Sequence, residues 1–191
     1  KTRNSLTGKS NLGYATFLPI VDSMDNPVVH KAGDLHLITY REIFHTKSRT
    51  PGNHWLRELF PENFFLLNVK DARRLGFRTG DRVRCVSDSN PKGVWVLPNF
   101  GEKPMVGKVK ASQGIRPGVV AFSLGHGHWA YGSSDVTIDG VRVSGDKARG
   151  TGVHANAAMM VDPHLKNVGL QDLVGGSVCF YDSAVRLVRE A

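Results

Sequence analysis

NFFLLNVKDARRLGFRTGDRVRCVS, residues 63–87, contains consecutive elements that decide the fold. The apolar run at residues 64–67 is typical of a buried strand. Asn68 follows at a helix N-cap position, Asp71 completes a weak capping box, and Gly76 stands where the helix would end in a left-handed residue. From Arg82 onward, side chains alternate as in a half-buried strand. The stretch therefore predicts a strand, a helix of about two turns, a turn and a second strand.

The rest of the chain is dominated by short strand patterns. Apolar or alternating runs recur at residues 35–40, 94–97, 105–111, 119–122 and 184–188. Asp139 and Gly140 mark the turn of a small hairpin, and residues 154–160 can form a short helix. Short strands and tight turns with few helices favour a mainly β fold with a closed barrel over a doubly wound sheet.

The chain is long enough for one domain. Its 191 residues can bury a sizeable core. Residues 1–33 are rich in Ser, Asn, Gly, Lys and Pro around one apolar patch, so we interpret them as a linker or N-terminal arm, and residues 34–191 as the domain. No run of about 18 apolar residues and no signal-peptide core is present, and the first residue is Lys1. We expect a piece of a longer protein.

Charge and cysteine content narrow the class of partner. The 25 basic and 17 acidic residues give a net charge of +8, which favours phosphate groups, nucleic acid or an acidic protein face. The basic residues are dispersed, however, so composition does not indicate nucleic acid. Cys85 and Cys179 lie far apart without metal-ligand spacing, which argues against a zinc site or a disulfide scaffold.

Three segments carry candidate binding groups. Residues 41–53 form a polar loop whose cationic and hydroxyl groups suit a phosphate, although a solvated loop explains the same composition. Residues 125–132 alternate glycines with histidines and aromatics, so a ligand can approach the backbone closely. His126 and His128 lack a third metal ligand of fixed spacing, which favours hydrogen bonding or stacking over metal binding. Asn156 is either a turn residue or a functional amide.

Taken in order, several motifs resemble the C-terminal molybdopterin-dinucleotide-binding domain of the dimethyl-sulfoxide-reductase family of molybdenum and tungsten enzymes. They are Thr39-Tyr40-Arg41 with His45 and Ser48-Arg49-Thr50; Asn68-x-x-Asp71-Ala72-x-x-Leu75-Gly76-x-x-x-Gly80-Asp81-x-Val83; Gly114-x-Arg116-Pro117-Gly118-Val119-Val120; and Asn156. The resemblance covers residues 35–188. Residues 60–63, 125–132 and 175–177 look most like the catalytic subunits of tetrathionate reductases and their arsenate and thiosulfate or polysulfide reductase relatives.

This resemblance implies a six-stranded double-psi β-barrel that binds bis-molybdopterin guanine dinucleotide with molybdenum or tungsten. By position, a cofactor tail would be lined by Arg41, His45, Thr46, Ser48, Arg49 and Thr50. His128 and Trp129 would lie near a pterin, and Asn156 would hydrogen-bond a pterin edge. The family's metal ligand and its cluster-binding cysteines lie in upstream domains, so no residue of this chain is expected to be catalytic or to bind a metal.

The resemblance also implies a parent enzyme. That enzyme would reduce a sulfur compound or an oxyanion such as tetrathionate in anaerobic respiration, and its upstream part would carry a 4Fe–4S cluster. Expected partners are the upstream domains of the same chain, an iron–sulfur electron-transfer subunit, and also a membrane anchor subunit, with no nucleic acid. We expect the chain alone to be inactive and the parent to be extracytoplasmic, in the periplasm or at the membrane.

Two other interpretations remain open at this point. The chain can be a non-catalytic β-barrel that binds nucleic acid or a protein through its basic surface, because barrels of this size serve many functions. It can also be a stand-alone double-psi barrel of the aspartate-decarboxylase or ATPase N-domain type. Asn156 and the segment at residues 125–129 argue against the latter.

Overall fold

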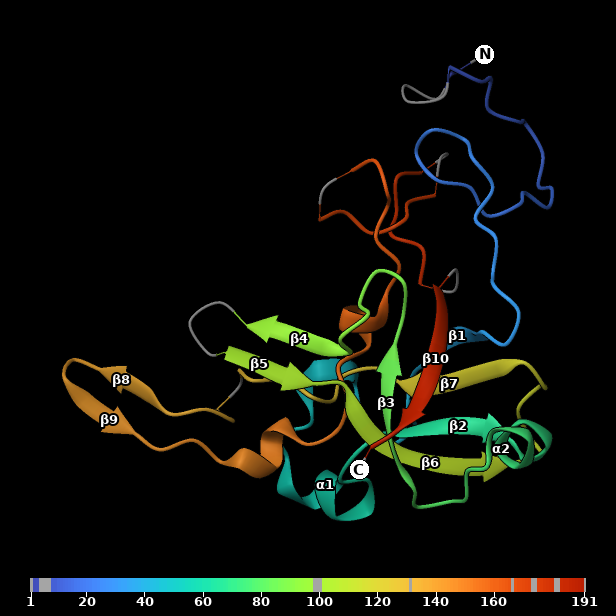
Figure 1. Ribbon diagram of the computed structural model, residues 1–191. Helices are drawn as coiled ribbons and strands as arrows, with labels where there is room; N and C mark the ends of the chain where they lie inside the picture. The colour runs from blue at the N-terminus through green and yellow to red at the C-terminus, as the bar shows by residue number, and fades with distance from the viewer. Residues whose placement is uncertain are drawn as a thin grey trace.

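A closed six-stranded barrel forms the centre of the computed structural model, which describes residues 2–3, 8–97, 101–130, 132–165, 167–172, 175–180 and 183–190 (Figure 1). In order around the barrel, the strands are β1 (Leu35–Tyr40), β10 (Ser183–Arg189), β3 (Arg82–Val86), β6 (Val106–Ser112), β2 (Phe64–Asn68) and β7 (Val119–Ser123). The pairs β1–β7 and β2–β6 are parallel, and the other four are antiparallel. The expected mainly β fold with a six-stranded barrel is confirmed.

Residues 63–87 fold as the sequence predicts. Helix α2 (Val69–Leu75) connects β2 to β3, and the Asn68 side chain caps it by accepting from the Lys70 N–H at 2.8 Å. Gly76 ends the helix with φ 74°, in the left-handed region that favours glycine. The Asp71 carboxylate is used elsewhere than in the predicted capping box, since it accepts from the Gly118 N–H at 2.6 Å. The helix is thereby fastened to the start of β7.

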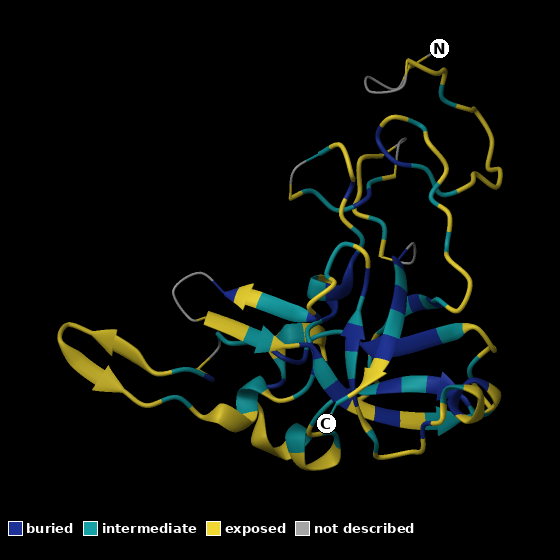
Figure 2. Ribbon diagram, viewed as in Figure 1, coloured by how far each residue is buried: buried dark blue, intermediate teal, exposed yellow. Residues whose placement is uncertain are grey.

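Figure 2 shows buried residues concentrated on the barrel strands. They form one hydrophobic core cluster. The fully buried side chains include Leu35, Leu37, Phe65, Leu67, Val83, Val109, Val120, Phe122 and Val185, which come from all six strands. Phe65 and Phe122 meet edge to face at 5.3 Å between ring centroids. Cys85 is a free thiol in this core, and burial raises its pKa to about 12, which makes it chemically inert.

Smaller elements surround the barrel. They are α1 (His54–Leu59), the 3-10 helices η1 (Lys47–Arg49), η2 (Lys147–Gly150) and η3 (Ala155–Ala158), the hairpin of β4 (Val94–Leu97) and β5 (Gly101–Pro104), and the hairpin of β8 (Val136–Ile138) and β9 (Val141–Val143). The predicted hairpin at Asp139 and Gly140 is confirmed, and the short helix within residues 154–160 is η3. The sequence patterns did not predict α1, although Asn53 caps it. The described part of the chain contains no helix that is long and apolar enough to cross a membrane.

The described part of residues 1–33 is an extended arm (Figure 1). It contains only isolated bridges, Arg3 with Ser10 and Val21 with Pro27. The apolar patch at residues 17–21 is exposed over its first three residues, and Phe17 itself is 90% exposed. An exposed apolar patch of this size predicts docking on a neighbouring domain.

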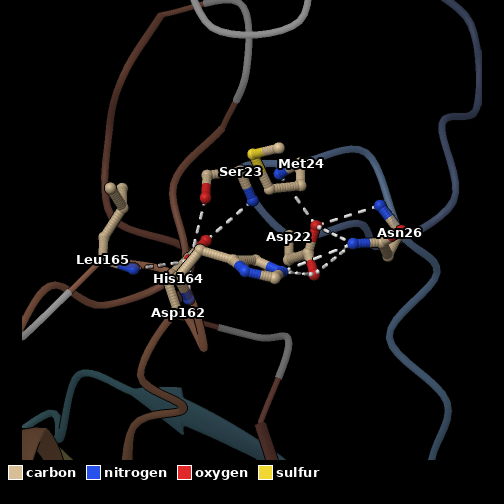
Figure 3. Close-up of polar contacts among 7 residues, drawn as sticks. All are labelled: Asp22, Ser23, Met24, Asn26, Asp162, His164 and Leu165. Atoms are coloured by element: carbon tan, nitrogen blue, oxygen red, sulfur yellow. Dashed lines mark hydrogen bonds and ion pairs between the residues drawn. The ribbon is translucent and has the colours of Figure 1, made fainter.

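Two facing turns hold the arm to the rest of the molecule (Figure 3). The Asp162 carboxylate accepts from the backbone N–H and the hydroxyl of Ser23, at 2.7 and 2.9 Å. The Asp22 carboxylate accepts from the Asn26 N–H and from His164 Nε2, both at 2.9 Å. Both carboxylates are buried. These charge-assisted bonds therefore fix residues 22–26 of the arm against residues 162–165.

Candidate functional site

The Gly-rich segment brings the three candidate binding segments together. A Cβ on Gly125 would lie 2.2 Å from the carbonyl carbon of Lys47, in the polar loop, and a Cβ on Gly127 would lie 2.4 Å from the backbone nitrogen of His154, beside η3. Both glycines have positive φ, 99° and 75°. Since no other residue fits such close backbone contacts, these glycines allow residues 41–53, 124–129 and 151–156 to pack directly against one another.

The polar loop presents several donors on its outer side. Arg41, Thr46 and Arg49 are exposed, and Ser48 and Thr50 are half-buried. Thr50 Oγ1 accepts from the Thr46 N–H at 2.7 Å and closes the loop around η1. The exposed cations and hydroxyls are therefore carried by a folded turn and not by a loose chain.

His45 differs from the other predicted residues of this loop because it is buried. Its Nε2 lies 2.8 Å from the carbonyl oxygen of Phe60, which can only accept, so Nε2 carries the proton. Nδ1 then accepts from Thr50 Oγ1 at 3.3 Å. Both ring nitrogens are engaged inside the protein, and in this structure His45 supports the loop from beneath.

An aromatic and histidine cluster stands at the other end of the Gly-rich segment. The His154 ring lies 4.0 Å from Trp95 and 4.6 Å from His128, between ring centroids. His154 Nδ1 accepts from the Asn156 N–H at 3.1 Å, which caps η3. Lys103 Nζ donates to the Gly127 carbonyl at 2.8 Å and also to the Gly150 carbonyl. Trp95, Lys103 and His154 were not predicted, because nothing in their local sequence distinguishes them from ordinary strand and loop residues.

Burial keeps the imidazoles of this cluster neutral. Burial, with the charges of His128 and Lys103, lowers the pKa of His154 to about 4. Burial and the Lys103 charge also lower the pKa of His128. Burial lowers the pKa of Lys103 itself. At neutral pH the imidazoles therefore offer hydrogen bonds and ring surfaces but no positive charge.

Two adjoining open grooves border the predicted pterin-binding residues. A groove of about 700 Å³ is lined by Asn156, Trp95, Asn90 and Lys92, among others. A second groove, of about 380 Å³, is lined by His128, Trp129, Lys103, Ser133 and Ser134, and Glu102 lines both. Asn156 is exposed, while His128 and Trp129 are half-buried. Tyr131, from the same Gly-rich segment, lies outside the described residues.

His126 is not at the surface of this face. It is buried against the rings of His45 and Phe60, and its Nε2 has no hydrogen-bond partner among the described residues. Among the residues that the structure describes, no group of three metal-ligating side chains is present.

Comparison with known proteins identifies the family. The profile of a family described as "Molydopterin dinucleotide binding domain" matches residues 35–172, most of the barrel and the whole of the face described above. The chain belongs to this family. The expected resemblance of this molybdopterin dinucleotide-binding domain to the dimethyl-sulfoxide-reductase family is thus confirmed.

Curated relatives of this molybdopterin dinucleotide-binding domain are subunits of reductases. A selenate reductase subunit from Mesobacillus selenatarsenatis is 44% identical over 189 residues, covering 98% of this chain and 18% of that protein. A tetrathionate reductase subunit from Salmonella typhimurium is 31% identical over 56% of this chain and 9% of that protein. The molybdopterin-containing arsenate respiratory reductase subunit of Shewanella sp. is 29% identical over 63% and 14%. The chain spans less than a fifth of each relative.

The solved structure of acetylene hydratase from Pelobacter acetylenicus shares the fold. Its TM-score is 0.56 at 17% identity, covering 92% of this chain and 21% of that one. The selenate reductase subunit matches with higher identity than the tetrathionate reductase subunit. The relatives therefore support a reductase domain without singling out tetrathionate as the substrate.

Proposed function

We propose that the chain binds molybdopterin guanine dinucleotide along the face formed by the polar loop, the Gly-rich segment and η3. The observation that supports this proposal is the backbone contact of Gly125 with Lys47 and of Gly127 with His154, which brings three separately predicted segments into contact. A set of side-chain donors and rings that comes from neighbouring segments is what binding of a dinucleotide requires.

The residues present fit the phosphate part of such a cofactor. Arg41 and Arg49 are exposed cations, and Thr46 and Ser48 add hydroxyl donors to the same turn. Arginine forks and hydroxyls match the oxygens of a pyrophosphate. The net charge of +8 favours the same anionic ligand. His45 would act through Thr50, which it supports.

The other end of the face fits a flat heterocycle. His128 and Trp129 line a groove of about 380 Å³, and Asn156 lines one of about 700 Å³, volumes common for small-molecule sites. Neutral imidazole, indole and amide groups offer stacking surfaces and hydrogen bonds to a pterin. When bound, the metal-pterin group supplies the redox chemistry, and this chain supplies binding and orientation.

The parent protein is proposed to be the catalytic subunit of a reductase. The names of the relatives favour an oxyanion or sulfur compound, such as selenate, arsenate or tetrathionate, as its substrate. We further propose that the parent binds two dinucleotides with one molybdenum or tungsten ion and carries an upstream 4Fe–4S domain. Its proposed partners are an iron–sulfur subunit and a membrane anchor subunit, and its proposed location is extracytoplasmic. The purified chain alone is expected to reduce none of these substrates.

Titration of the purified chain with GDP, as a surrogate for the cofactor tail, tests the proposal. Amide NMR shifts are expected at residues 41–50, with shifts at Trp129 and Asn156 on addition of the intact cofactor. Arg49→Gln is expected to weaken GDP binding about tenfold, because it removes a charge-assisted contact. Arg78→Gln is the matched control, since Arg78 is equally exposed but lies on the turn between α2 and β3.

Two outcomes would refute the cofactor face. Equal loss in both variants would mean that GDP binds by general charge alone. Tight binding to DNA or RNA with a steep salt dependence, and no preference for the guanine nucleotide, would support the nucleic-acid-binding alternative instead.

A further inference from the structure

The β8–β9 hairpin has an unusual distribution of apolar side chains. Its two strands pair Val136 with Val143, Thr137 with Arg142 and Ile138 with Val141. Directly opposed residues share a face of a hairpin. One face is therefore entirely aliphatic, made of Val136, Ile138, Val141 and Val143, and we call it the aliphatic face; the other carries Thr137 and Arg142.

The aliphatic face is open to solvent. Val136, Ile138, Val141 and Val143 are 45%, 56%, 65% and 46% exposed. The hairpin extends away from the barrel, past the β4–β5 hairpin, and is exposed along its whole length (Figures 1 and 2). A two-stranded hairpin is marginally stable in water by itself. A contiguous exposed aliphatic surface on such an element points to a partner surface.

The base of the hairpin is firmly built. The Asp135 carboxylate accepts from the Gly145 N–H at 2.9 Å and pairs with Arg142. A Cβ on Gly145 would lie 2.5 Å from the Ser134 carbonyl carbon, so the two chain segments are in close backbone contact. The Asp146 N–H donates to the Gly132 carbonyl at 2.8 Å. The base of the hairpin, residues 132–135 and 145–146, is therefore held in a fixed conformation.

The base of the hairpin adjoins the proposed cofactor face. Ser134 Oγ donates to the Trp129 carbonyl at 2.6 Å. Ser133 and Ser134 line the same groove as His128 and Trp129. A surface that covers a cofactor in this groove from outside would continue onto the hairpin.

We propose that the aliphatic face packs against another domain of the same, longer polypeptide, one that also borders the groove of Trp129 and Ser134. The proposal rests on the proposed function. The relatives provide the room for such a domain, because this chain matches only 18%, 9% and 14% of their lengths.

The size of the face favours a partner in the same chain over a second copy. Four aliphatic side chains offer about 400 Å² at most, whereas a stable interface between separate proteins needs about 800 Å² from each partner. Within one polypeptide the two surfaces meet at high effective concentration, so a small contact is sufficient.

Hydrogen exchange of the hairpin amides tests this inference. It is measured in the longer polypeptide with its cofactor and, for comparison, in the purified chain. The amides of residues 136–143 are expected to exchange at least tenfold more slowly in the longer polypeptide. Ile138→Glu is expected to abolish this extra protection, since it places a charge in the contact. Thr137→Glu, the neighbouring residue on the opposite face, is the matched control and is expected to retain it. Unchanged melting of both variants of the purified chain establishes that the barrel is intact.

The outcomes separate this inference from the proposed function. Absence of pterin and guanine nucleotide from the longer polypeptide would refute the proposed function. Rapid exchange of the hairpin in a cofactor-loaded longer polypeptide, or equal effects of Ile138→Glu and Thr137→Glu, would overturn the hairpin contact. Protection that rises with the concentration of the purified chain would show that a second copy covers the hairpin. Protection that requires a separate protein would show a different partner. Either result would also overturn the proposed contact within one polypeptide.

Discussion

Gly127 lies so close to His154 that a Cβ on Gly127 would be 2.4 Å from the backbone nitrogen of His154. This contact connects the Gly-rich segment to η3. Gly127 also has φ 75°, which disfavours any side chain. Gly127→Ala therefore combines backbone strain with a steric clash.

We expect Gly127→Ala to lower the free energy of unfolding by about 3 kcal/mol or more. Gly33→Ala is the control, because Gly33 has φ 91° but open space around its Cβ position, and it should cost about 1–2 kcal/mol. Urea denaturation of both variants measures the difference. Equal costs would show that the contact between Gly127 and His154 relaxes freely.

Asn63 fastens the His154 segment to the barrel. Its side chain is buried and donates to the Ser123 and Val153 carbonyls at 2.8 and 2.9 Å, while accepting from the Val153 N–H at 2.8 Å. Asn63→Ala removes three hydrogen bonds to buried backbone groups, so we expect a loss of about 2–4 kcal/mol in urea denaturation. Asn11→Ala, which removes only a solvent-exposed bond to Thr2, should change stability by less than about 0.5 kcal/mol. A cost below about 1 kcal/mol for Asn63→Ala would contradict the bridging role.

The buried histidine His126 predicts how stability depends on pH. Burial, with His45 and His128 nearby, lowers its pKa to about 4. The unfolded chain binds a proton near pH 6.5, which the folded protein does not accept until about pH 4. The contribution is therefore complete above about pH 6.5, and stability falls as pH decreases through this window.

His126→Phe keeps the ring contacts with Phe60 and His45 but removes this proton. The slope of unfolding free energy against pH between about 6.5 and 4 should decrease by about one proton, while the His154 contribution, with a pKa of about 4, remains. Denaturation at several pH values measures the slope, and NMR titration measures each pKa directly. A His126 pKa near its ordinary value would refute the prediction.

Asp162 holds the N-terminal arm. Burial raises its pKa, but bonds from His164, Ser23 and Leu165 outweigh that effect and keep the pKa below the ordinary value. A lowered carboxyl pKa stabilises the contact above about pH 4, and this contribution is lost as pH falls through the folded-state pKa. Acid should therefore release the arm.

Asp162→Ala is expected to increase hydrogen exchange of the Ser23 amide at least about tenfold, because it removes the charged acceptor. Ser23→Ala is a graded control, since it removes the hydroxyl bond and leaves the backbone bond to Asp162. Its effect on arm exchange and on proteolysis should be smaller. Identical exchange and proteolysis of both variants would show that contacts other than the Asp162 carboxylate attach the arm.

Much of the local structure could be predicted from sequence. The Asn68 cap, the Gly76 helix end and the Asp139–Gly140 turn were all predicted and are present. Each depends on atoms within a few residues along the chain, so local patterns are sufficient. The barrel itself follows from many short alternating strands, and the family was recognisable from an ordered set of motifs.

The burial of His45 and the role of Asp71 were not predictable from local patterns. Phe60, which engages His45, is 15 residues away in sequence, and Gly118, which binds Asp71, is 47 residues away. A polar residue in a loop pattern can be a surface donor or a buried support. Only the packing of the neighbouring segments distinguishes the two.

The sequence by itself determined the strands, the caps, the turns and the polar and Gly-rich segments that the family motifs share. The tertiary structure alone decided that Gly127 meets His154, that Lys103 donates to the Gly127 carbonyl, and that the aliphatic face of the β8–β9 hairpin stays uncovered. The physical reason is the sequence separation of the partners. Helix caps and tight turns form hydrogen bonds between residues a few positions apart. The tertiary contacts form only after the barrel has closed and brought distant segments together.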